Sequence, residues 1–546
     1  MDSDAARRRI VHRAINPSLS SLPDWVAEYR AHQVGAINAI IEAFERVNVV
    51  IVDAPTGSGK TLIGETVGRM LGAPRLYTCS SKLLQGQVVS DFPYARLLQG
   101  RSNYPTFWKP KSYHPANPMG HISCEDCTWS LTKTCAFCPE KFQCPYEQAK
   151  RAALHADMAV VNTSYLLTEA NHIGKFSDRQ FVILDEADTL ESSLMNHVSV
   201  EIGERRLERY GWEPPARITV EDSWVEWLDH TSNDVRIRSA GMGDVSKDVR
   251  VAREARYLQQ LESKLDDVRL GIPSGNWVYT GRGASDPPLR YGPGVSFRPA
   301  RVDHLGKDYL WRHSQKWLLM SATVISSDEL MESLGWDEPF ETVRVPSTFP
   351  VENRRVFYRG VVSMAYKNRS EDAWRTLADR IRSDLADHRG HRVLIHTVSY
   401  ALTDFLGRAL EKGAGRDVLW YSNAIGKEAT VRKYLESDNA VLIGPSLSRG
   451  LDLPGDACRV QMLTKVPYPS VKDRQVNKRL YSKGGRLWYA VQTVRELVQM
   501  CGRAVRSESD WAVTYIYDRD FETNLWARNR TLFPSWFREA IVWRER

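Results

Sequence analysis

One short stretch limits the fold of this chain more than any other: the glycine-rich segment from Asp53 to Thr61. It follows β-branched residues over 49–52, typical of a buried parallel strand, and precedes a segment over 62–71 with helical spacing of apolar residues. Strand, glycine-rich turn and helix in this order form a phosphate-binding loop, because backbone N–H groups and the helix N-terminus surround an anion. The predicted nucleotide site therefore contains Ala54, Pro55, Thr56, Gly57, Ser58, Gly59, Lys60 and Thr61.

Within this loop, Lys60 and Thr61 have the side chains that the chemistry needs. The Lys60 ammonium can reach the β- and γ-phosphates, and the Thr61 hydroxyl can bind Mg²⁺. Ala54 stands where the usual pattern has its first glycine. About twenty residues upstream, Arg30 and Gln33 follow Tyr29 and could contact an adenine, although a plain polar helix face is the alternative interpretation.

A second nucleotide element follows at residues 181–188. Four apolar residues predict a buried strand, and Asp185 and Glu186 emerge at its carboxyl end, where α/β sheets place ligands. We expect Asp185 to hold Mg²⁺ and Glu186 to orient or deprotonate the attacking water. The alternative is that both carboxylates only cap the next helix.

Five of the eight cysteines lie between residues 124 and 144. Two C-x2-C pairs at this spacing predict a four-thiolate metal site rather than disulfides. Spacing alone does not separate Zn²⁺ from an iron–sulfur cluster, because both are bound by four thiolates. The five candidates for four positions are Cys124, Cys127, Cys135, Cys138 and Cys144.

Composition sets outer limits on the class of protein. A chain of 546 residues should contain several domains, and 42% hydrophobic with 26% charged residues is typical of globular proteins. No apolar run approaches the ~20 residues that cross a bilayer, and the N-terminus lacks the apolar core of a signal peptide. We expect a cytosolic protein. The net charge of +7 permits a nucleic-acid partner without requiring one.

The remaining chain predicts an insertion and a second α/β domain. Residues 246–270 have apolar positions at helical spacing, and 271–294 are rich in turn residues. We expect core packing for Trp224, Trp227 and Trp277, with base stacking as the alternative. Predicted strands over 316–320, 393–397 and 441–443 end in small or polar residues, and the last leads to Gly450 and Asp452.

Arg503 and Arg506 follow Gln499 near the end of this second domain. Three residues apart on a helix, the two arginines share a face and can address one phosphate group. Such arginine fingers stabilise the charge that develops in phosphoryl transfer. The alternative is a solvated surface pair.

Taken together and in order, these segments resemble superfamily 2 helicases: Ala54 to Thr61, Asp185-Glu-Ala-Asp188, Ser321-Ala-Thr323, Arg449-Gly-Leu-Asp452 and Gln499-x-x-Gly-Arg-x-x-Arg506. The cysteine cluster and the insertion are similar to the XPD/DinG group, as are residues 144–150 and 160–165. The resemblance implies an α/β fold of two RecA-like parallel-sheet domains, with a cysteine-rich [4Fe–4S] domain and a helical arch-like insertion in the first. The implied boundaries are 1–99, 147–190 and 301–345 for the first RecA-like domain, 100–146 and 191–300 for the insertions, and 346–546 for the second domain.

The same resemblance implies an ATP-dependent helicase that moves 5′→3′ on single-stranded DNA and opens forked or tailed duplexes, as a cytoplasmic monomer of a bacterium or phage-infected cell. Gln33 would read adenine, Thr323 would couple nucleotide to DNA, and Gln499, Gly450 and Asp452 would meet the nucleotide from the second domain. Tyr104 is followed by Pro105 where the family often has a cysteine. We therefore predict Cys124, Cys127, Cys138 and Cys144 as cluster ligands, with Cys135 in reserve and Zn²⁺ as the alternative metal.

Two other functions are compatible with the sequence. One is a nucleic-acid-stimulated ATPase that translocates or remodels without strand separation, or acts on RNA. The other is a binding module with an inactive nucleotide fold, which the presence of Lys60, Glu186 and both arginines disfavours.

Overall fold

The protein is described from a computed structural model of its 546 residues. The structure describes residues 22–543, with gaps at 24, 27, 73, 107–122, 128–129, 131–134, 170, 172–173, 218–219, 243–248, 273–274, 281–293, 366–367, 369, 413–414, 424–425, 446, 448–454, 503–504 and 506–509.

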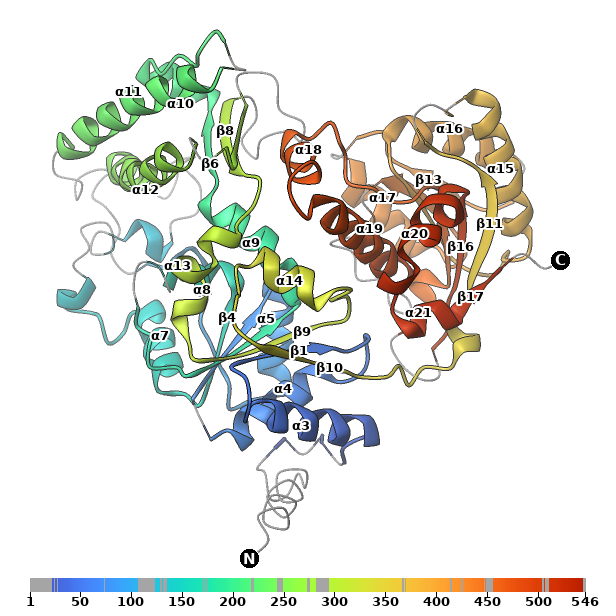
Figure 1. The fold of residues 1–546 in the computed structure, drawn as a ribbon, viewed down its shortest axis with the longest axis horizontal. Coiled ribbons are helices and arrows are strands. Elements are labelled where there is room, and N and C mark those ends of the chain that lie inside the picture. The colour runs from blue at the N-terminus through green and yellow to red at the C-terminus, as the bar shows by residue number, and fades with distance from the viewer. Residues whose placement is uncertain are drawn as a thin grey trace, which may run out of the picture.

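The first lobe is built on a seven-stranded parallel sheet (Figure 1). In spatial order its strands are β10 (Phe340–Arg344), β1 (Val49–Asp53), β9 (Lys316–Ser321), β5 (Phe181–Asp185), β2 (Arg75–Cys79), β4 (Met158–Asn162) and β3 (Arg96–Leu97). Side chains of β1 alternate between two buried hydrophobic clusters, one on each face of the sheet, which explains its unbroken apolar run. The helices that pack on it are α3 (Ala31–Ala43), α4 (Lys60–Met70), α5 (Lys82–Asp91), α7 (Pro145–His155), α8 (Thr163–Thr168), α9 (Leu190–Val198) and α14 (Ser327–Ser333).

The second lobe repeats the same architecture. In spatial order its parallel strands are β13 (Val418–Trp420), β14 (Val441–Pro445), β12 (Val393–Thr397), β15 (Val460–Leu463), β16 (Val513–Asp518), β11 (Val356–Val362) and β17 (Ile541–Val542). Its longer helices are α15 (Glu371–Ala386), α16 (Tyr400–Glu411), α17 (Lys427–Glu436), α18 (Arg474–Leu480) and α19 (Gly485–Cys501). Two parallel-sheet lobes confirm the predicted fold class.

The insertion in the first lobe is only partly as predicted. Its helices are α10 (Glu204–Tyr210), α11 (Glu221–Ala240) and α12 (Val249–Gly271), and α12 matches the predicted helix. The insertion also contains an antiparallel sheet, β6 (Val200–Gly203), β8 (Gly294–Pro299) and β7 (Trp277–Thr280), and β7 lies where only turns were expected. The three tryptophans named above are buried, which confirms their role in the core.

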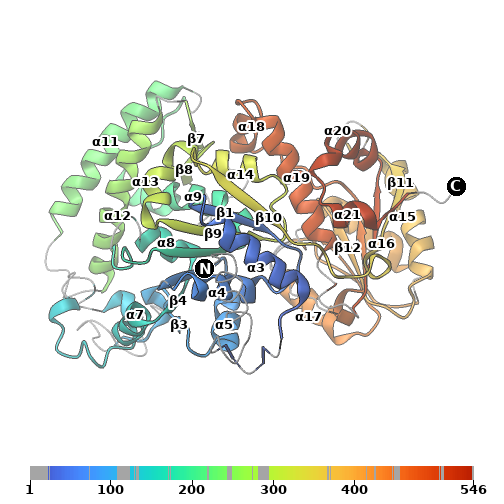
Figure 2. The ribbon, with the colours of Figure 1, turned by 60° about the horizontal axis from the view of Figure 1, so that its bottom comes forward.

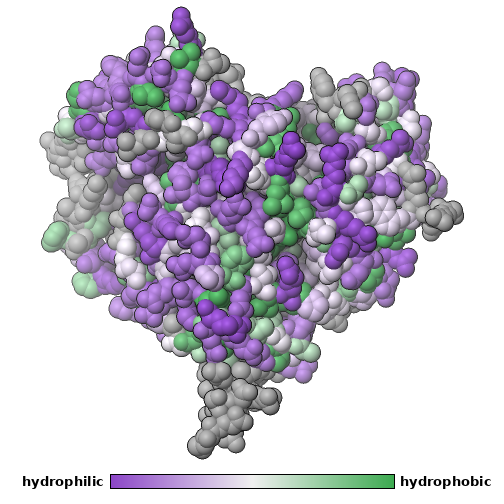
Figure 3. All heavy atoms as spheres, viewed as in Figure 1, coloured by the Kyte–Doolittle hydropathy of each residue, from purple (hydrophilic) through white to green (hydrophobic). Residues whose placement is uncertain are grey.

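The two lobes lie side by side, and the insertion stands beyond the first lobe, with α18 and α19 on the side of the second lobe that faces it (Figures 1 and 2). In the view of Figure 3, hydrophilic residues cover most of the surface, and hydrophobic residues gather in a small area near the boundary of the lobes. None of the helices in the described ranges has the length and hydropathy needed to span a membrane.

Candidate nucleotide site between the two lobes

Strand register brings the predicted acidic residues to one edge of the first sheet. Asp53 ends β1 and is paired in register with Ser321 at the end of β9, and Asp185 ends β5 beside Met320 of β9. Parallel strands bind ligands at their carboxyl ends. The phosphate-loop segment and the Asp185 segment therefore converge, as the sequence predicted.

The loop itself takes the shape that its glycines permit. Gly57 and Gly59 have φ angles of 80° and 79°, in the left-handed region that favours glycine, and Gly59 caps α4. A Cβ at Gly59 would also lie 2.2 Å from Nε2 of Gln33. Position 59 therefore requires glycine both for its backbone angle and for the close approach of α3.

Side chains at the start of α3 contact backbone carbonyl groups of the loop. Gln33 Nε2 donates to the Ser58 carbonyl at 3.1 Å, the His32 ring lies 3.1 Å from the same oxygen, and Arg30 Nη1 donates to the Gly57 carbonyl at 3.3 Å. Gln33 is also buried and accepts from the Arg30 N–H. The adenine contacts predicted for Arg30 and Gln33 stay a prediction, while their contacts with the loop are direct. Sequence reasoning did not single out His32.

Lys60 is surrounded by acidic residues. Burial lowers the pKa of the Lys60 ammonium, and the carboxylates of Asp185 and Glu186 oppose that change. Burial raises the pKa of Asp185, which Lys60 and a 3.0 Å hydrogen bond from the Tyr77 hydroxyl partly offset. Burial also raises the pKa of Asp53, to about 6. A buried cluster with more carboxylates than cations favours a bound metal cation, as a Mg²⁺–nucleotide complex would supply.

Glu186 has a strained backbone and a basic carboxylate. Its φ of 55° is in the left-handed region, which costs a non-glycine residue about 1–2 kcal/mol and is typical of functional sites. Burial raises the pKa of Glu186, while a hydrogen bond from the Ser80 hydroxyl lowers it. A carboxylate with a raised pKa is a better general base, which is the role predicted for Glu186.

A hydrogen-bonded bridge joins this site to the second lobe. Asp188 accepts from the hydroxyls of Ser321 at 2.5 Å and Thr323 at 3.2 Å. From α19 in the second lobe, Gln499 Nε2 donates to Asp188 at 2.8 Å and to the Thr323 hydroxyl at 2.9 Å. Arg495 Nε donates to the Thr323 carbonyl at 3.2 Å. Both lobes therefore contribute side chains to one buried polar network.

A second inter-lobe contact lies three residues after Asp188, and sequence reasoning missed it. Buried Glu191 of α9 accepts from Arg479 at 3.4 Å and from the indole of Trp488 at 3.1 Å, both from the second lobe. Arg479 also donates to Ser333 at 2.9 Å. The available signal was a charged residue at a helix position that faces the core.

Four of the predicted second-lobe residues lie outside the described residues: Gly450, Asp452, Arg503 and Arg506. Gln499 is described, and its amide contacts the first lobe as given above. The contribution of the other four to the nucleotide stays a prediction.

The cysteine-rich segment is described in part. Arg101 donates to the thiols of Cys124 at 3.7 Å and Cys135 at 3.4 Å. Burial, with nearby Cys144 and Cys127, raises the pKa of the Cys124 thiol to about 12, although Arg101 opposes the change. In the described part of the chain, no three His, Cys, Asp or Glu side chains form a group that could hold a metal. The predicted ligand set is therefore untested, and Cys135 rather than Cys138 shares Arg101 with Cys124.

The cysteine-rich segment also contacts the insertion. Arg253 of α12 donates to both carboxylate oxygens of Asp126, at 2.6 and 2.9 Å, and Arg256 donates to the Glu125 carbonyl at 2.6 Å. A bidentate pair fixes orientation as well as distance. The two insertions of the first lobe are therefore joined to each other.

Comparison with known proteins agrees with this geometry. The DEAD_2 family profile matches residues 114–207, and a profile described as Helicase C-terminal domain matches residues 382–540. The solved structure titled XPD_Helicase superposes with a TM-score of 0.60 at 15% identity, covering 94% of this chain and 99% of that one. Residues 114–207 are therefore similar to the DEAD_2 family and residues 382–540 to helicase C-terminal domains, and the fold is that of the solved XPD structure.

One more solved structure and two curated proteins are also similar to this chain. The structure titled "Structure of S. tokodaii Xpd4" has a TM-score of 0.57 at 13% identity, covering 94% of this chain and all of that one, and such low identity indicates the fold alone. The Fanconi anemia group J protein homolog of Gallus gallus is 34% identical over 119 residues, 19% of this chain and 9% of that protein. ATP-dependent DNA helicase CHL1 of Candida albicans is 28% identical over 116 residues, 18% of this chain and 13% of that protein. The chain thus spans less than a fifth of the length of these curated relatives.

Proposed function

We propose that this protein is an ATP-driven helicase that moves along single-stranded DNA and separates duplex DNA. The observation that carries the proposal is the bridge from Gln499 of α19 to Asp188 and Thr323. Asp188 lies three residues after Asp185, so a change at the nucleotide reaches the second lobe through two short hydrogen bonds. Relatives named as ATP-dependent DNA helicases support the choice of ATP and DNA.

The chemical roles follow from the chain's own residues. Lys60 would bind the β- and γ-phosphates, Thr61 and Asp185 would hold Mg²⁺, and Glu186 would activate water. Arg503 and Arg506, with Gly450 and Asp452, would approach the nucleotide from the second lobe. When these groups share one triphosphate, they draw the lobes together, and hydrolysis removes the charge that they share.

Directional stepping needs lobes that bind the strand with different affinity in the two states. Phosphate contacts and base stacking supply the binding, the latter about 1–3 kcal/mol per base. Opening one base-pair step costs about 1.4 kcal/mol on average, so a wedge that stacks the freed base offsets most of that cost. We assign the wedge to the cysteine-rich segment, and movement 5′→3′ as a monomer follows the family resemblance.

The experiment compares the wild type with Lys60→Ala and with Lys412→Ala, an exposed lysine that follows α16. ATP hydrolysis is measured with single-stranded DNA and RNA, and strand displacement with 5′- and 3′-tailed duplexes of each. Lys60→Ala should reduce ATPase activity by about 10²–10³-fold and abolish displacement, while Lys412→Ala should match the wild type. ATPase activity without displacement would instead identify a translocase or remodeller, and stronger stimulation by RNA an RNA helicase. Unchanged ATPase activity in Lys60→Ala would reject the assigned site.

For the cysteine-rich segment we propose a [4Fe–4S] cluster. A cluster would be held by thiolates, and the Arg101 guanidinium lies beside two of the candidate thiols, those of Cys124 and Cys135. Purified protein should be brown and contain about four iron atoms per chain, while colourless protein with zinc would reject the cluster. A variant with Cys124→Ser and Cys144→Ser should lose iron and unwinding but keep most DNA-stimulated ATPase activity. Cys458→Ser, in the second lobe, serves as the control.

A further inference from the structure

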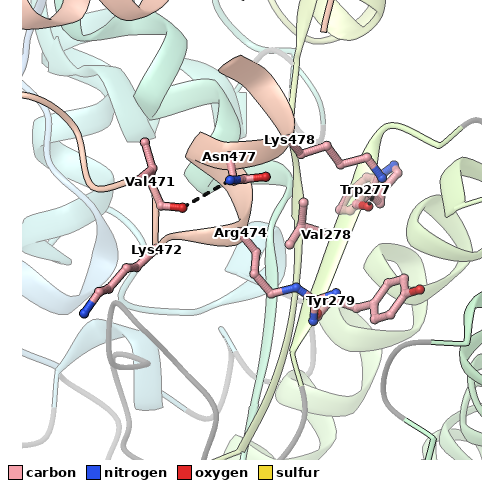
Figure 4. A pocket seen from close by; sticks show the side chains of 8 residues that line it. All are labelled: Trp277, Val278, Tyr279, Val471, Lys472, Arg474, Asn477 and Lys478. Carbon is pink, nitrogen blue, oxygen red and sulfur yellow. Dashed lines mark hydrogen bonds between the residues drawn. The ribbon is translucent and has the colours of Figure 1, made fainter. Parts of the chain in front are cut away.

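An open cavity of about 330 Å³ lies between the insertion and the second lobe, and none of the nucleotide-site residues described above lines it (Figure 4). Strand β7 of the insertion forms one wall with residues 277–279. The other wall is α18 and the turn before it, with Val471, Lys472, Arg474, Asn477 and Lys478. The size is at the small end of ligand-binding cavities.

The charged residues that line this cavity are all positive. Three of its eight lining residues are cations, and none of the eight carries a carboxylate. Over 471–486 the sequence has six basic residues and one acid, Asp473. The Asp473 carboxylate accepts from the backbone N–H groups of Gln475 and Val476, so it caps α18 rather than pairing with a cation.

Two of the cations are held in place by the edge of the insertion's sheet. In the described chain, β7 pairs only with β8, so its outer carbonyl groups need other donors. Arg474 donates to the Tyr279 carbonyl at 2.6 Å, and Lys478 donates to the Trp277 carbonyl at 3.0 Å. Each contact uses one N–H group of a side chain that has several. The other N–H groups of these two side chains make no hydrogen bond to the residues that the structure describes.

The third cation, Lys472, is exposed, and no hydrogen bond or ion pair engages it within the described part of the chain. The cations of the cavity also repel one another. Burial lowers the pKa of the Lys478 ammonium, and nearby Arg474 adds to this effect, while Glu221 at the start of α11 opposes it. A bound anion would relieve that repulsion. Tyr481, just after α18, exposes most of its ring, which suits base stacking on the same element.

We propose that the cavity between β7 and α18 is a binding site for the phosphate backbone of single-stranded nucleic acid, formed by Lys472, Arg474 and Lys478. The inference rests on the proposed function, because it assigns part of the path of the strand. A phosphate held there contacts the second lobe through α18 and lies against the insertion, so strand occupancy would link these two parts of the molecule.

The test is a salt titration of binding between the full chain and a fluorescent oligo(dT) strand. The variant is Lys472→Glu, because Lys472 is exposed and makes no hydrogen bond or ion pair with the described residues. The matched control is Lys433→Glu, an exposed lysine on α17 with the same change of net charge. Each lost phosphate contact makes the slope of log K against log salt shallower by about 0.7 for a single strand. We expect that change and a three- to tenfold loss of affinity at low salt for Lys472→Glu, equally on oligo(dT) and oligo(dA), and neither for Lys433→Glu.

Equal losses in both variants, or no loss in Lys472→Glu, would overturn the proposed site while leaving the proposed function in place. A competition experiment with poly-glutamate tests for an acidic protein partner instead. If poly-glutamate competes with the oligonucleotide at equal charge concentration, and loses that ability in Lys472→Glu, the proposed nucleic-acid site is overturned in favour of such a partner. A wild-type chain that binds no single strand would reject the proposed function and this site together.

Discussion

At the scale of single residues, Gly59 shows how one position can be fixed by two independent requirements. Its left-handed backbone and the approach of Gln33 both exclude a side chain. Gly59→Ala should therefore destabilise the loop by about 1–2 kcal/mol from backbone strain alone and weaken nucleotide binding. Thermal unfolding and nucleotide titration measure the two effects.

Gly35 supplies the control for this substitution. It lies in α3, two residues from Gln33, and a Cβ there would meet nothing within 4 Å. Gly35→Ala should stabilise the protein by about 0.5–1 kcal/mol, because alanine is the better helix former. A Gly59→Ala protein as stable as the wild type would contradict the assigned loop geometry.

Glu191 makes a prediction about pH. Burial and neighbouring Glu329 together raise the pKa of Glu191 to about 7, even though Arg479, the Trp488 hydrogen bond and Arg495 oppose the change. The folded state then holds this proton more tightly than the unfolded chain, where a Glu has a pKa near 4.3. Stability from this carboxyl is therefore present below pH 4.3 and is lost as pH rises towards 7.

Glu191→Gln removes that titration and keeps an acceptor for Trp488. The free energy of unfolding of the wild type should fall between pH 5 and 7 relative to that of the variant, by on the order of 1–3 kcal/mol. Denaturant unfolding at several pH values measures it, with Glu428→Gln on α17 as a control at an exposed position. Parallel pH profiles for all three proteins would contradict the assignment.

At the scale of elements, α19 is the part of the second lobe that meets the first. Trp488, Arg495 and Gln499 are seven and four residues apart, so they lie along one face of the helix, and each donates to the first lobe. Gln499→Ala removes the bridge to Asp188 and Thr323. We expect DNA-stimulated ATP turnover to fall by about tenfold while nucleotide affinity in the absence of DNA is retained.

The control is Gln492→Ala, the same substitution on the same helix, at a residue whose side chain makes no hydrogen bond in the described structure. Steady-state ATPase assays with and without single-stranded DNA compare the two variants. If Gln492→Ala lowers stimulated turnover as much as Gln499→Ala does, the loss comes from the helix in general and not from the bridge.

How much of this the sequence could predict depends on whether a feature is local. The β1 strand, the phosphate loop and Asp185 were predictable because apolar runs and glycine-rich turns report local geometry. Strand β7 was missed because its short run lies among Gly and Pro residues, and pairing with β8 overrides that local signal. The contacts of Glu191 with Arg479 join residues 288 apart in sequence, so no local pattern could reveal them.

At the scale of the whole molecule, the two lobes are connected in a way that lets a bound ligand bring them together. Within the described structure the chain passes from the first lobe to the second once, between β10 and β11. The other described links between the lobes are side-chain contacts, such as those of α18 and α19. A single connection with polar contacts permits hinge motion, because such interfaces resemble transient ones rather than a continuous core.

Closure should therefore require one triphosphate bound from both sides. Addition of Mg²⁺ and a non-hydrolysable ATP analogue should reduce the radius of gyration measured by small-angle scattering. Arg503→Ala should still bind the analogue through Lys60 but fail to close, and its ATP turnover should fall by about 10³–10⁵-fold. Lys433→Ala, at an exposed position of α17, should close like the wild type. If Arg503→Ala closes and turns over ATP normally, the second lobe does not complete the site, and the motor must derive its motion from the Gln499 bridge alone.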